Sequence, residues 1–168
     1  ELGGADAHMG RSGVVHFVAD DDEQAILIAQ KLLSFLPQNN TEDPPIVDPD
    51  DVVEANPKLR EIIPVQSNKG YDVREVIAEI VDHQDFLEVQ AGWAMNIVIG
   101  FARINGRSIG IVANQPSVMS GVLDIDSSDK ASKFIRFCNA FNIPLVNLVD
   151  VPGFLPGVTQ EHNGIIRH

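Results

Sequence analysis

The sequence is poor in cysteine, in basic residues and in long apolar runs, and each shortage excludes a class of protein. Its 168 residues include one cysteine, Cys138, so no disulfide can form within the chain and a reducing compartment is expected. Lysine and arginine number 12 against 24 acidic residues, and the net charge of −12 argues against nucleic-acid binding and against a basic membrane-binding surface. No apolar run approaches the ~20 residues that a membrane-spanning helix needs.

The familiar catalytic motifs are also missing. There is no Walker A pattern, no Gly-x-Ser-x-Gly elbow, no His-Glu-x-x-His and no Cys-x-x-Cys. The glycines at 100 and 106 have the wrong spacing for a dinucleotide-binding loop. Cys138 lies in an amphipathic stretch, and we interpret it as a small buried hydrophobe rather than a nucleophile. No metal site is predicted.

What is present begins with a strand and a helix. Residues 13–19 are rich in valine and phenylalanine and predict a strand. Asp20 with Glu23 matches a capping box, so the run of three aspartates that starts at Asp20 is interpreted as a helix start rather than a metal site. The helix that follows carries apolar residues at helical spacing, and it ends before Pro37.

A change of composition follows this helix. Half of the ten prolines and many acidic residues fall in residues 37–57. We predict an exposed, semi-extended linker here, with a domain boundary between residues 37 and 70. With 44% hydrophobic residues, the chain can build one domain with a core, or parts of two.

The second half predicts a β-hairpin. Residues 97–104 and 107–113 are rich in β-branched residues and flank Asn105-Gly106. Asn-Gly is typical of the type I′ turn, in which both central residues need positive φ. Residues 86–89 predict a short strand before the hairpin.

Two helices are predicted around the hairpin. The first starts at a capping box, Asp72 with Glu75. The second starts at one of residues 127–129 and ends near Asn142, after a short extended piece at residues 119–125. The strand after it should lie parallel to the second hairpin arm, because a helix makes the crossover between them.

That last strand leads into the loop that is the candidate site. Residues 145–149 form an apolar run that is too short for a helix and predicts a strand covered on both faces. A loop at the carboxyl end of such a strand is where open α/β folds place ligands. Glycines in it, Gly153 above all, let backbone N–H groups approach a substrate oxygen. Asp150 could act as a general base or a metal ligand, but we favour a role in which it accepts hydrogen bonds from the turn at 152–154.

A series of longer motifs runs in order along almost the whole chain. The most specific is the loop after the last strand, Asp150-Val-Pro-Gly-Phe-Leu-Pro-Gly157. The others are Leu2-Gly-Gly-Ala5 with His8, Ser12-Gly13 and His16, Leu32-Leu-Ser-Phe-Leu-Pro37, Asn105-Gly-Arg107, Gly110-Ile-Val-Ala-Asn-Gln-Pro116, Lys130-Ala131, Phe134-Ile135, Phe137-Cys138, Gln160-Glu161 and Gly164-Ile-Ile-Arg-His168. Together they resemble the biotin-dependent acyl-CoA carboxyltransferase family, in particular the carboxyltransferase subunits of propionyl-CoA carboxylase, methylmalonyl-CoA decarboxylase and transcarboxylase.

The resemblance implies an α/β fold of the crotonase-like (ClpP/crotonase) class, in a subunit with two such domains. Residues 1–36 would be the C-terminal tail of the first, acyl-CoA-side domain. Residues 37–70 would be the acidic, proline-rich linker, and residues 71–168 the N-terminal part of the second, biotin-side domain. This division agrees with the linker predicted from composition.

The resemblance also implies a reaction that needs no reactive side chain. In the family, carboxybiotin releases carbon dioxide, the biotin anion takes the α-proton of the acyl-CoA, and the resulting enolate captures the carbon dioxide. Backbone amides hold both anions. Carried over, the amides of Gly153 and Phe154 would form part of the biotin-side oxyanion hole, and Leu155, Gly157 and Asn114 would line that pocket. Such donors should lie ~2.7–3.1 Å from the charged oxygen.

The same resemblance implies the partners. The substrate would be an acyl-CoA of the propionyl-CoA or methylmalonyl-CoA type, and biotin would be presented by a carrier protein or domain without a covalent bond to this chain. The subunit would form a homo-oligomer, a hexamer built from dimers, in the cytoplasm, or in the mitochondrial matrix if the source is eukaryotic. No nucleic acid and no membrane insertion by this chain are expected.

We also expect the chain to be an internal piece that is inactive alone. In the family, the glycine loop for the acyl-CoA lies upstream of residue 1, and the second half of the biotin-side hole lies beyond residue 168. Two alternatives stay open: a crotonase-type acyl-CoA hydratase or isomerase, for which no clear carboxylate pair is found, and a non-catalytic carboxyltransferase-like scaffold.

Overall fold

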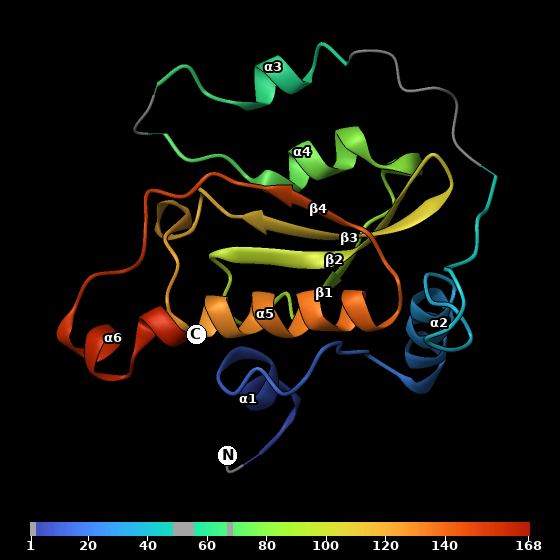
Figure 1. Cartoon of the computed structure of the whole chain (residues 1–168), viewed down its shortest axis with the longest axis horizontal. Helices are drawn as coiled ribbons and strands as arrows, with labels where there is room; N and C mark the ends of the chain where they lie inside the picture. The colour runs from blue at the N-terminus through green and yellow to red at the C-terminus, as the bar shows by residue number, and fades with distance from the viewer. Residues whose placement is uncertain (1–2, 49–55, 67–68) are drawn as a thin grey trace.

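A mixed four-stranded sheet lies at the centre of the structure, with one helix on each face (Figure 1). Helix α4 (Val73–Ile80) covers one face and helix α5 (Ile125–Ala140) covers the other. The computed structural model describes residues 3–48, 56–66 and 69–168. Leu2 of the first motif and residues 49–55 and 67–68 of the predicted linker, with Pro49 among them, lie outside the described residues.

The predicted hairpin is confirmed and forms the middle of the sheet. Strands β2 (Ile97–Ile104) and β3 (Arg107–Asn114) pair along their whole length. Asn105 and Gly106 both have positive φ, 52° and 72°, as a type I′ turn requires. The buried Asp82 carboxylate accepts hydrogen bonds from both turn amides, at 2.9 and 2.7 Å. This carboxylate accepts hydrogen bonds from two backbone donors that would otherwise lack an acceptor at the tip of the hairpin.

The two outer strands also lie where the sequence predicts them. β1 (Leu87–Val89) pairs antiparallel with β2, and β4 (Leu145–Leu148) pairs parallel with β3. The expectation that the last strand is covered on both faces holds only in part, since Leu145 packs on the α5 side of the sheet and Val146 and Leu148 pack on the α4 side. β4 is the edge strand of the sheet order β1-β2-β3-β4, its residues are half-buried or exposed, and Val149 is 75% exposed. An apolar run does not tell whether a strand lies inside a sheet or at its edge.

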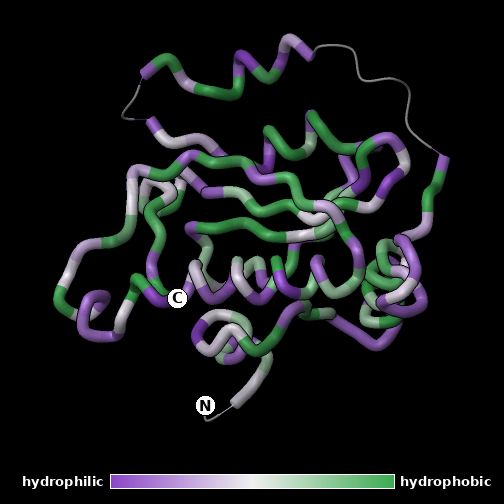
Figure 2. Tube along the Cα trace, in the orientation of Figure 1, coloured by the Kyte–Doolittle hydropathy of each residue, from purple (hydrophilic) through white to green (hydrophobic). Residues whose placement is uncertain are grey.

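Alternation along the hairpin divides the core into two layers, and Figure 2 shows hydrophobic residues concentrated in the strands. Val98 and Ala102 face α4, whereas Ile99 and Phe101 face α5. The layer beneath α4 contains Val73, Ile77, Val81, Val98, Ala102, Ile109, Ile111 and Ala113. The layer beneath α5 contains Phe35, Val89, Ile99, Phe101, Phe134, Cys138 and Ile143.

Cys138 is confirmed as a buried core residue. It is fully buried on α5, in the layer that also holds Phe134. Burial raises the pKa of its thiol to about 12, so the thiolate that a nucleophile requires is suppressed.

The predicted strand at residues 13–19 is not found. After helix α1 (Ala5–Gly10) the chain runs without strand pairing to helix α2 (Asp22–Leu33). Gln90 holds it to the sheet region, because its backbone amide donates to the His16 carbonyl at 2.9 Å and its side-chain amide donates to the Gly13 carbonyl. The helix start is one residue later than predicted, because the Asp21 side chain caps it by accepting from the Gln24 amide at 2.8 Å. The aspartate run therefore serves a helix start, as interpreted.

Phe35 fixes this N-terminal part on the sheet. Its side chain is fully buried, its ring stacks on Phe101 with centroids 5.9 Å apart, and the Arg103 guanidinium lies 4.2 Å from the Phe35 ring centroid. Beyond it, the Asn142 side chain donates to the carbonyls of Asn40 and Glu42 at 3.2 and 3.0 Å. Residues on both sides of the predicted domain boundary thus share one core layer, and the division into domains stays a prediction.

Helix α5 begins earlier than predicted. Asp124, not a residue at 127–129, is the N-cap, and it forms a reciprocal capping box with Ser127. The expected extended piece at 119–125 is instead a 3₁₀ turn, η2 (Met119–Gly121), followed by an isolated bridge. Asn142 ends the helix in the left-handed conformation with φ 57°, as expected of a C-terminal cap.

The remaining elements are short. They are α3 (Leu59–Ile62), η1 (Asp82–Gln84), α6 (Val158–His162) and η3 (Ile165–Arg167). α6 follows the candidate loop. Within the described ranges, none of the helices combines the length and the apolar character needed to span a bilayer.

Replacing Phe35 by alanine should destabilise the fold strongly. The substitution removes a fully buried ring, its stacking on Phe101 and its contact with Arg103. We expect a loss of about 3–5 kcal/mol in the free energy of unfolding, measured by denaturant titration of the full-length protein. Leu33→Ala is the control, since Leu33 is 67% exposed and should cost less than about 0.5 kcal/mol. Similar effects from both variants would contradict the role given to Phe35.

Candidate functional site

The loop after β4 adopts a backbone conformation that its glycines permit. Gly153 has φ 151° and Gly157 has φ 147°, values that residues with a Cβ rarely adopt. A Cβ built on either glycine meets no atom within 4 Å. The loop therefore presents bare backbone to open space at these two positions.

A short parallel bridge fixes the middle of this loop. The Leu123 amide donates to the Gly153 carbonyl at 3.1 Å, and the Leu155 amide donates to the Leu123 carbonyl at 2.7 Å. The Gly153 carbonyl and the Phe154 N–H belong to one planar trans peptide, so they point in opposite directions. The Leu123 amide therefore directs the Phe154 N–H away from the 121–124 segment.

The two amides predicted for the oxyanion hole have no partner within the described part of the chain. No hydrogen bond from the N–H of Gly153 or of Phe154 to these residues is found, and Phe154 is 53% exposed. The Leu155 amide differs, because Leu123 already accepts its hydrogen bond. Two adjacent free donors at the carboxyl end of a strand can together bind an anionic oxygen.

Asn114, predicted to line the same pocket, lies at the end of β3 beside the loop. It is 7% exposed, and its side-chain amide donates to the Gly121 carbonyl at 3.1 Å. Its side-chain oxygen accepts from the Asp150 amide at 3.3 Å. Asn114 thus joins the two loops that follow β3 and β4, with both polar ends of its side chain in use.

The turn role favoured for Asp150 is wrong. Its carboxylate accepts a hydrogen bond from the Tyr71 hydroxyl at 2.9 Å, and among the described residues no amide of the 152–154 turn donates to it. Burial, the hydrogen bond to Asp150 and its negative charge raise the pKa of Tyr71 to about 12. Asp150 was assigned to its nearest backbone donors, whereas its actual partner lies far away in the sequence.

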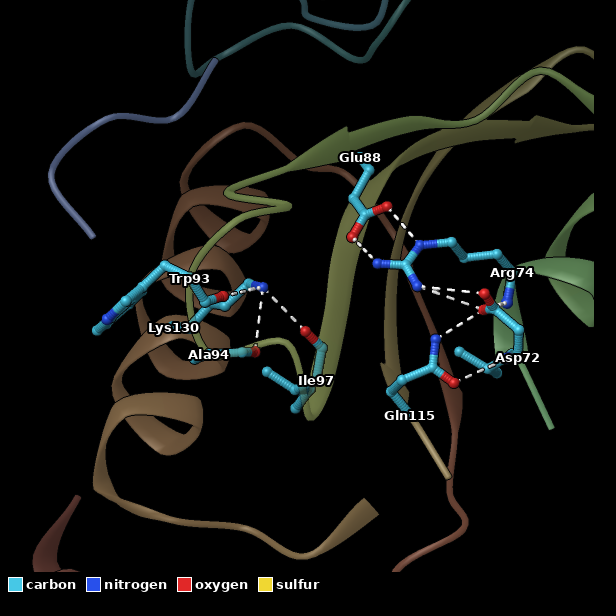
Figure 3. A network of polar contacts seen from close by, with 9 residues as sticks. Asp72, Arg74, Glu88, Trp93, Ala94, Ile97, Gln115 and Lys130 are labelled. Atoms are coloured by element: carbon cyan, nitrogen blue, oxygen red, sulfur yellow. Dashed lines mark hydrogen bonds and ion pairs between the residues drawn. The ribbon is translucent and has the colours of Figure 1, made fainter. Parts of the chain in front are cut away.

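Sequence reasoning missed a buried lysine behind the site. Lys130 of α5 is fully buried, and its ammonium donates to the carbonyls of Trp93, Ala94 and Ile97 at 2.7, 3.3 and 2.9 Å (Figure 3). Burial lowers its pKa to about 8. The one available signal was its position on the apolar stripe of α5, one turn before Phe134.

A second polar network, also unpredicted, joins α4 to the sheet. The Arg74 guanidinium forms a two-pronged ion pair with Glu88 of β1, with both distances 2.7 Å, and it also contacts Asp72 (Figure 3). The fully buried Gln115 side chain donates to Asp72 at 2.6 Å and accepts from the Val73 amide at 3.1 Å. Bidentate geometry of this kind orients the elements it joins.

A separate apolar pocket of about 390 Å³ lies on the α5 side of the sheet. None of the residues of the loop at 149–157 lines it. Its walls come from His16, Phe17, Leu32, Val89, Gln90, Ile99, Phe101, Lys133, Phe134 and Phe137. This pocket and the candidate loop are therefore separate features of the molecule.

Comparison with known proteins gives matches over the whole chain. A family model described as carboxyl transferase domain matches residues 1–168. The methylmalonyl-CoA carboxyltransferase 12S subunit of Propionibacterium freudenreichii subsp. shermanii is 68% identical over 100% of this chain and 32% of its own length. The propionyl-CoA carboxylase carboxyltransferase subunit of Haloferax mediterranei is 56% identical over 100% of this chain and 33% of its own length. The chain spans about a third of the length of these relatives.

Comparison with solved structures also gives matches over almost the whole chain. A crystal structure of transcarboxylase 12S, described as a hexamer with methylmalonyl-coenzyme A bound, matches with a TM-score of 0.97 at 68% identity, over 99% of this chain and 33% of that one. A single-chain, multi-domain long-chain acyl-CoA carboxylase matches with a TM-score of 0.79 at 29% identity, over 95% of this chain and 16% of that one. The predicted α/β, crotonase-like fold is confirmed.

Lys130 should give the protein a pH-dependent stability. Its folded pKa of about 8 lies below its ordinary value of 10.5, so between these values the unfolded chain keeps a proton that the folded chain has released. Raising the pH through this window therefore favours the folded state. We expect the stability advantage of wild type over Lys130→Met to grow between about pH 7.5 and 10, measured as thermal unfolding midpoints of the full-length protein.

Lys133→Met is the matched control, because Lys133 lies one turn along the same helix and is exposed. It should show no growth in its difference from wild type over that range. A constant or shrinking difference between wild type and Lys130→Met would contradict the assignment.

Tyr71 should resist ionisation. With a pKa of about 12, it should give no tyrosinate absorbance at pH about 10.5, where an ordinary tyrosine is mostly ionised. The difference in absorbance at alkaline pH between the full-length protein and its Tyr71→Phe variant isolates this group. Asp150→Asn should lower the pKa of Tyr71 only in part, since burial is the largest cause. A Tyr71 signal that titrates near pH 10 would refute the contact.

Proposed function

The chain belongs to the carboxyl transferase domain family, and on this basis we propose that the full-length protein transfers a carboxyl group between carboxybiotin and an acyl-CoA of the propionyl-CoA or methylmalonyl-CoA type. The observation that carries the proposal is the pair of adjacent amides, Gly153 and Phe154, that donate to none of the described residues at the carboxyl end of β4. The names of the relatives support this reaction, not a hydratase or isomerase.

The residues fit a bound biotin in a specific respect. An oxyanion hole needs N–H donors that are held rigidly and left without a protein acceptor. The Leu123 bridge holds the Gly153–Phe154 peptide, and a Cβ at Gly153 would point into open space. When bound, biotin would supply the carboxyl group and a ureido oxygen that becomes anionic as the group departs.

This chain would stabilise the negative charge that develops on the biotin ureido oxygen. The N–H groups of Gly153 and Phe154 would face the ureido oxygen, and each such donor contributes roughly 3–4 kcal/mol to a developing oxyanion. Gly157 would keep the rim of the loop free of side-chain atoms, whereas Leu155 and Asn114 would hold the loop from behind, because their polar groups already bind Leu123, Gly121 and Asp150.

The partners follow from the same basis. We propose that a separate carrier protein or domain presents biotin and that the full-length protein assembles as a hexamer, as the transcarboxylase 12S structure does. Residues 1–36 would belong to the acyl-CoA-side domain and residues 71–168 to the biotin-side domain. The chain alone would then be inactive.

Gly153→Ala in the full-length protein should impair carboxyl transfer. A Cβ at φ 151° is strained, so the loop should shift and misplace the two amides. We expect kcat for transfer from carboxybiotin to propionyl-CoA to fall by about 10²-fold. Gly106→Ala is matched for positive φ but lies at the far end of β3, and it should cost stability without changing kcat. Unchanged kcat in the Gly153→Ala protein with normal folding would reject the oxyanion role.

A further inference from the structure

Asn96 is a buried polar residue that lies outside the candidate site. It lies in the turn before β2 and is 3% exposed. Its side-chain amide donates to the Val122 carbonyl at 2.7 Å and to the Asp124 carboxylate at 3.1 Å. Both acceptors flank Leu123, the residue whose amide and carbonyl hold the candidate loop. Asn96 therefore contacts the support of the site and not the site itself.

The turn that carries Asn96 is itself rigidly held. The Lys130 ammonium binds the carbonyls of residues 93, 94 and 97 on either side of Asn96. The Gln115 amide donates to the Asn96 carbonyl at 3.0 Å. A buried side chain on a turn that is fixed from two sides has little freedom to move, so it can hold its hydrogen-bond partners in one position.

The contacts form a short series that ends at the catalytic peptide. Asn96 fixes the carbonyl of Val122, which belongs to the same peptide as the Leu123 N–H. That N–H binds the Gly153 carbonyl, which belongs to the same peptide as the Phe154 N–H. Each hydrogen bond thus sets the orientation of one peptide plane, and two hydrogen bonds link the Asn96 side chain to the peptide that carries the proposed oxyanion donor.

Asp124 completes the arrangement. Burial acts to raise the pKa of its carboxyl, but hydrogen bonds from Ser127 and Asn96 hold that pKa below its ordinary value. The charged carboxylate caps α5 and also accepts from Asn96. The 122–124 segment is therefore held at two points by one side chain, and it cannot rotate about either bond alone.

We propose that Asn96 is a positioning residue for the biotin-side oxyanion hole, acting through the Val122–Leu123 peptide to aim the Phe154 amide. The inference rests on the proposed function and names a residue that never touches the substrate. Asparagine suits the position because its amide offers two N–H donors to two oxygen acceptors. Aspartate has the same shape but presents an oxygen to the Val122 carbonyl and a negative charge to Asp124.

The test uses the full-length protein with Asn96→Asp and the milder Asn96→Ala. Transfer from carboxybiotin to propionyl-CoA is measured per acyl-CoA-binding site, counted by calorimetry, so that unfolded protein does not contribute. We expect kcat to fall at least about tenfold in Asn96→Asp, with the KM for propionyl-CoA within about twofold of wild type, because only the biotin-side donor is misplaced. The kcat of Asn96→Ala should also fall.

Asn142→Asp is the matched control. The Asn142 side chain also donates to two oxygen acceptors, the carbonyls of Asn40 and Glu42, but it contacts neither the 121–124 segment nor the loop. Its kcat and KM should match those of wild type.

The outcomes separate this inference from the proposed function. If the wild-type protein transfers no carboxyl group, the proposed function fails. If wild type is active and folded Asn96→Asp keeps its kcat, the positioning role is refuted while the function stands. If Asn96→Asp does not fold, Asn96→Ala decides by the same split between kcat and KM, and an equal loss in Asn142→Asp would also overturn the role.

Discussion

The parallel register between β3 and β4 is the constraint on which the candidate site depends. Gly110 pairs with Leu145 and Ala113 with Leu148, so both strands end at the same edge of the sheet. The chain after β3 and the chain after β4 must therefore leave side by side. Only then can Leu123 bridge to Gly153 and Leu155, and only then can Asn114 reach both loops. A slip of one residue would turn each side chain of β4 to the other face and separate these partners.

That register follows from features that a sequence displays locally. The Asn105-Gly106 turn and the β-branched runs around it predicted the hairpin, and helix α5 forced the last strand to lie parallel to the second arm. The failures have local causes as well. Residues 13–19 have the composition of a strand, but within the described residues their contacts with Gln90 do not extend into a ladder with β1. Helix α5 is capped by Asp124 because an aspartate with Ser127 three residues later offers a reciprocal cap. The composition of a segment favours one type of secondary structure. Whether and where that structure forms depends on the presence of a partner strand or of a better capping residue.

The polar contacts around the site could not be predicted in the same way. Lys130 binds carbonyls 33 to 37 residues away, and Tyr71 reaches Asp150 across 79 residues. Such pairs exist only once the fold is formed, because no spacing rule links their members. Asp150 shows how a prediction from neighbouring residues fails, since the nearest donors along the chain are not its partners. The site loop itself was found by its glycines and by the family resemblance. Leu123, which holds it, was not predicted, and Asn114 was predicted only as a residue that lines the pocket.

A site made of backbone amides changes where mutations should matter. Every residue except proline carries the same N–H, so no particular side chain at Phe154 is needed to supply the donor. What distinguishes this peptide is its fixed direction, and that direction comes from the hydrogen bond of Leu123. Asn96 binds Val122 and Asp124 on either side of Leu123, and Asn114 binds Gly121. Under the proposed function, substitutions of buried residues behind the loop, such as Asn96 and Asn114, should therefore matter more than a change of the side chain at Phe154. For the same reason, the proposed site depends on no reactive side chain, and its donors are backbone N–H groups at exposed positions of the loop.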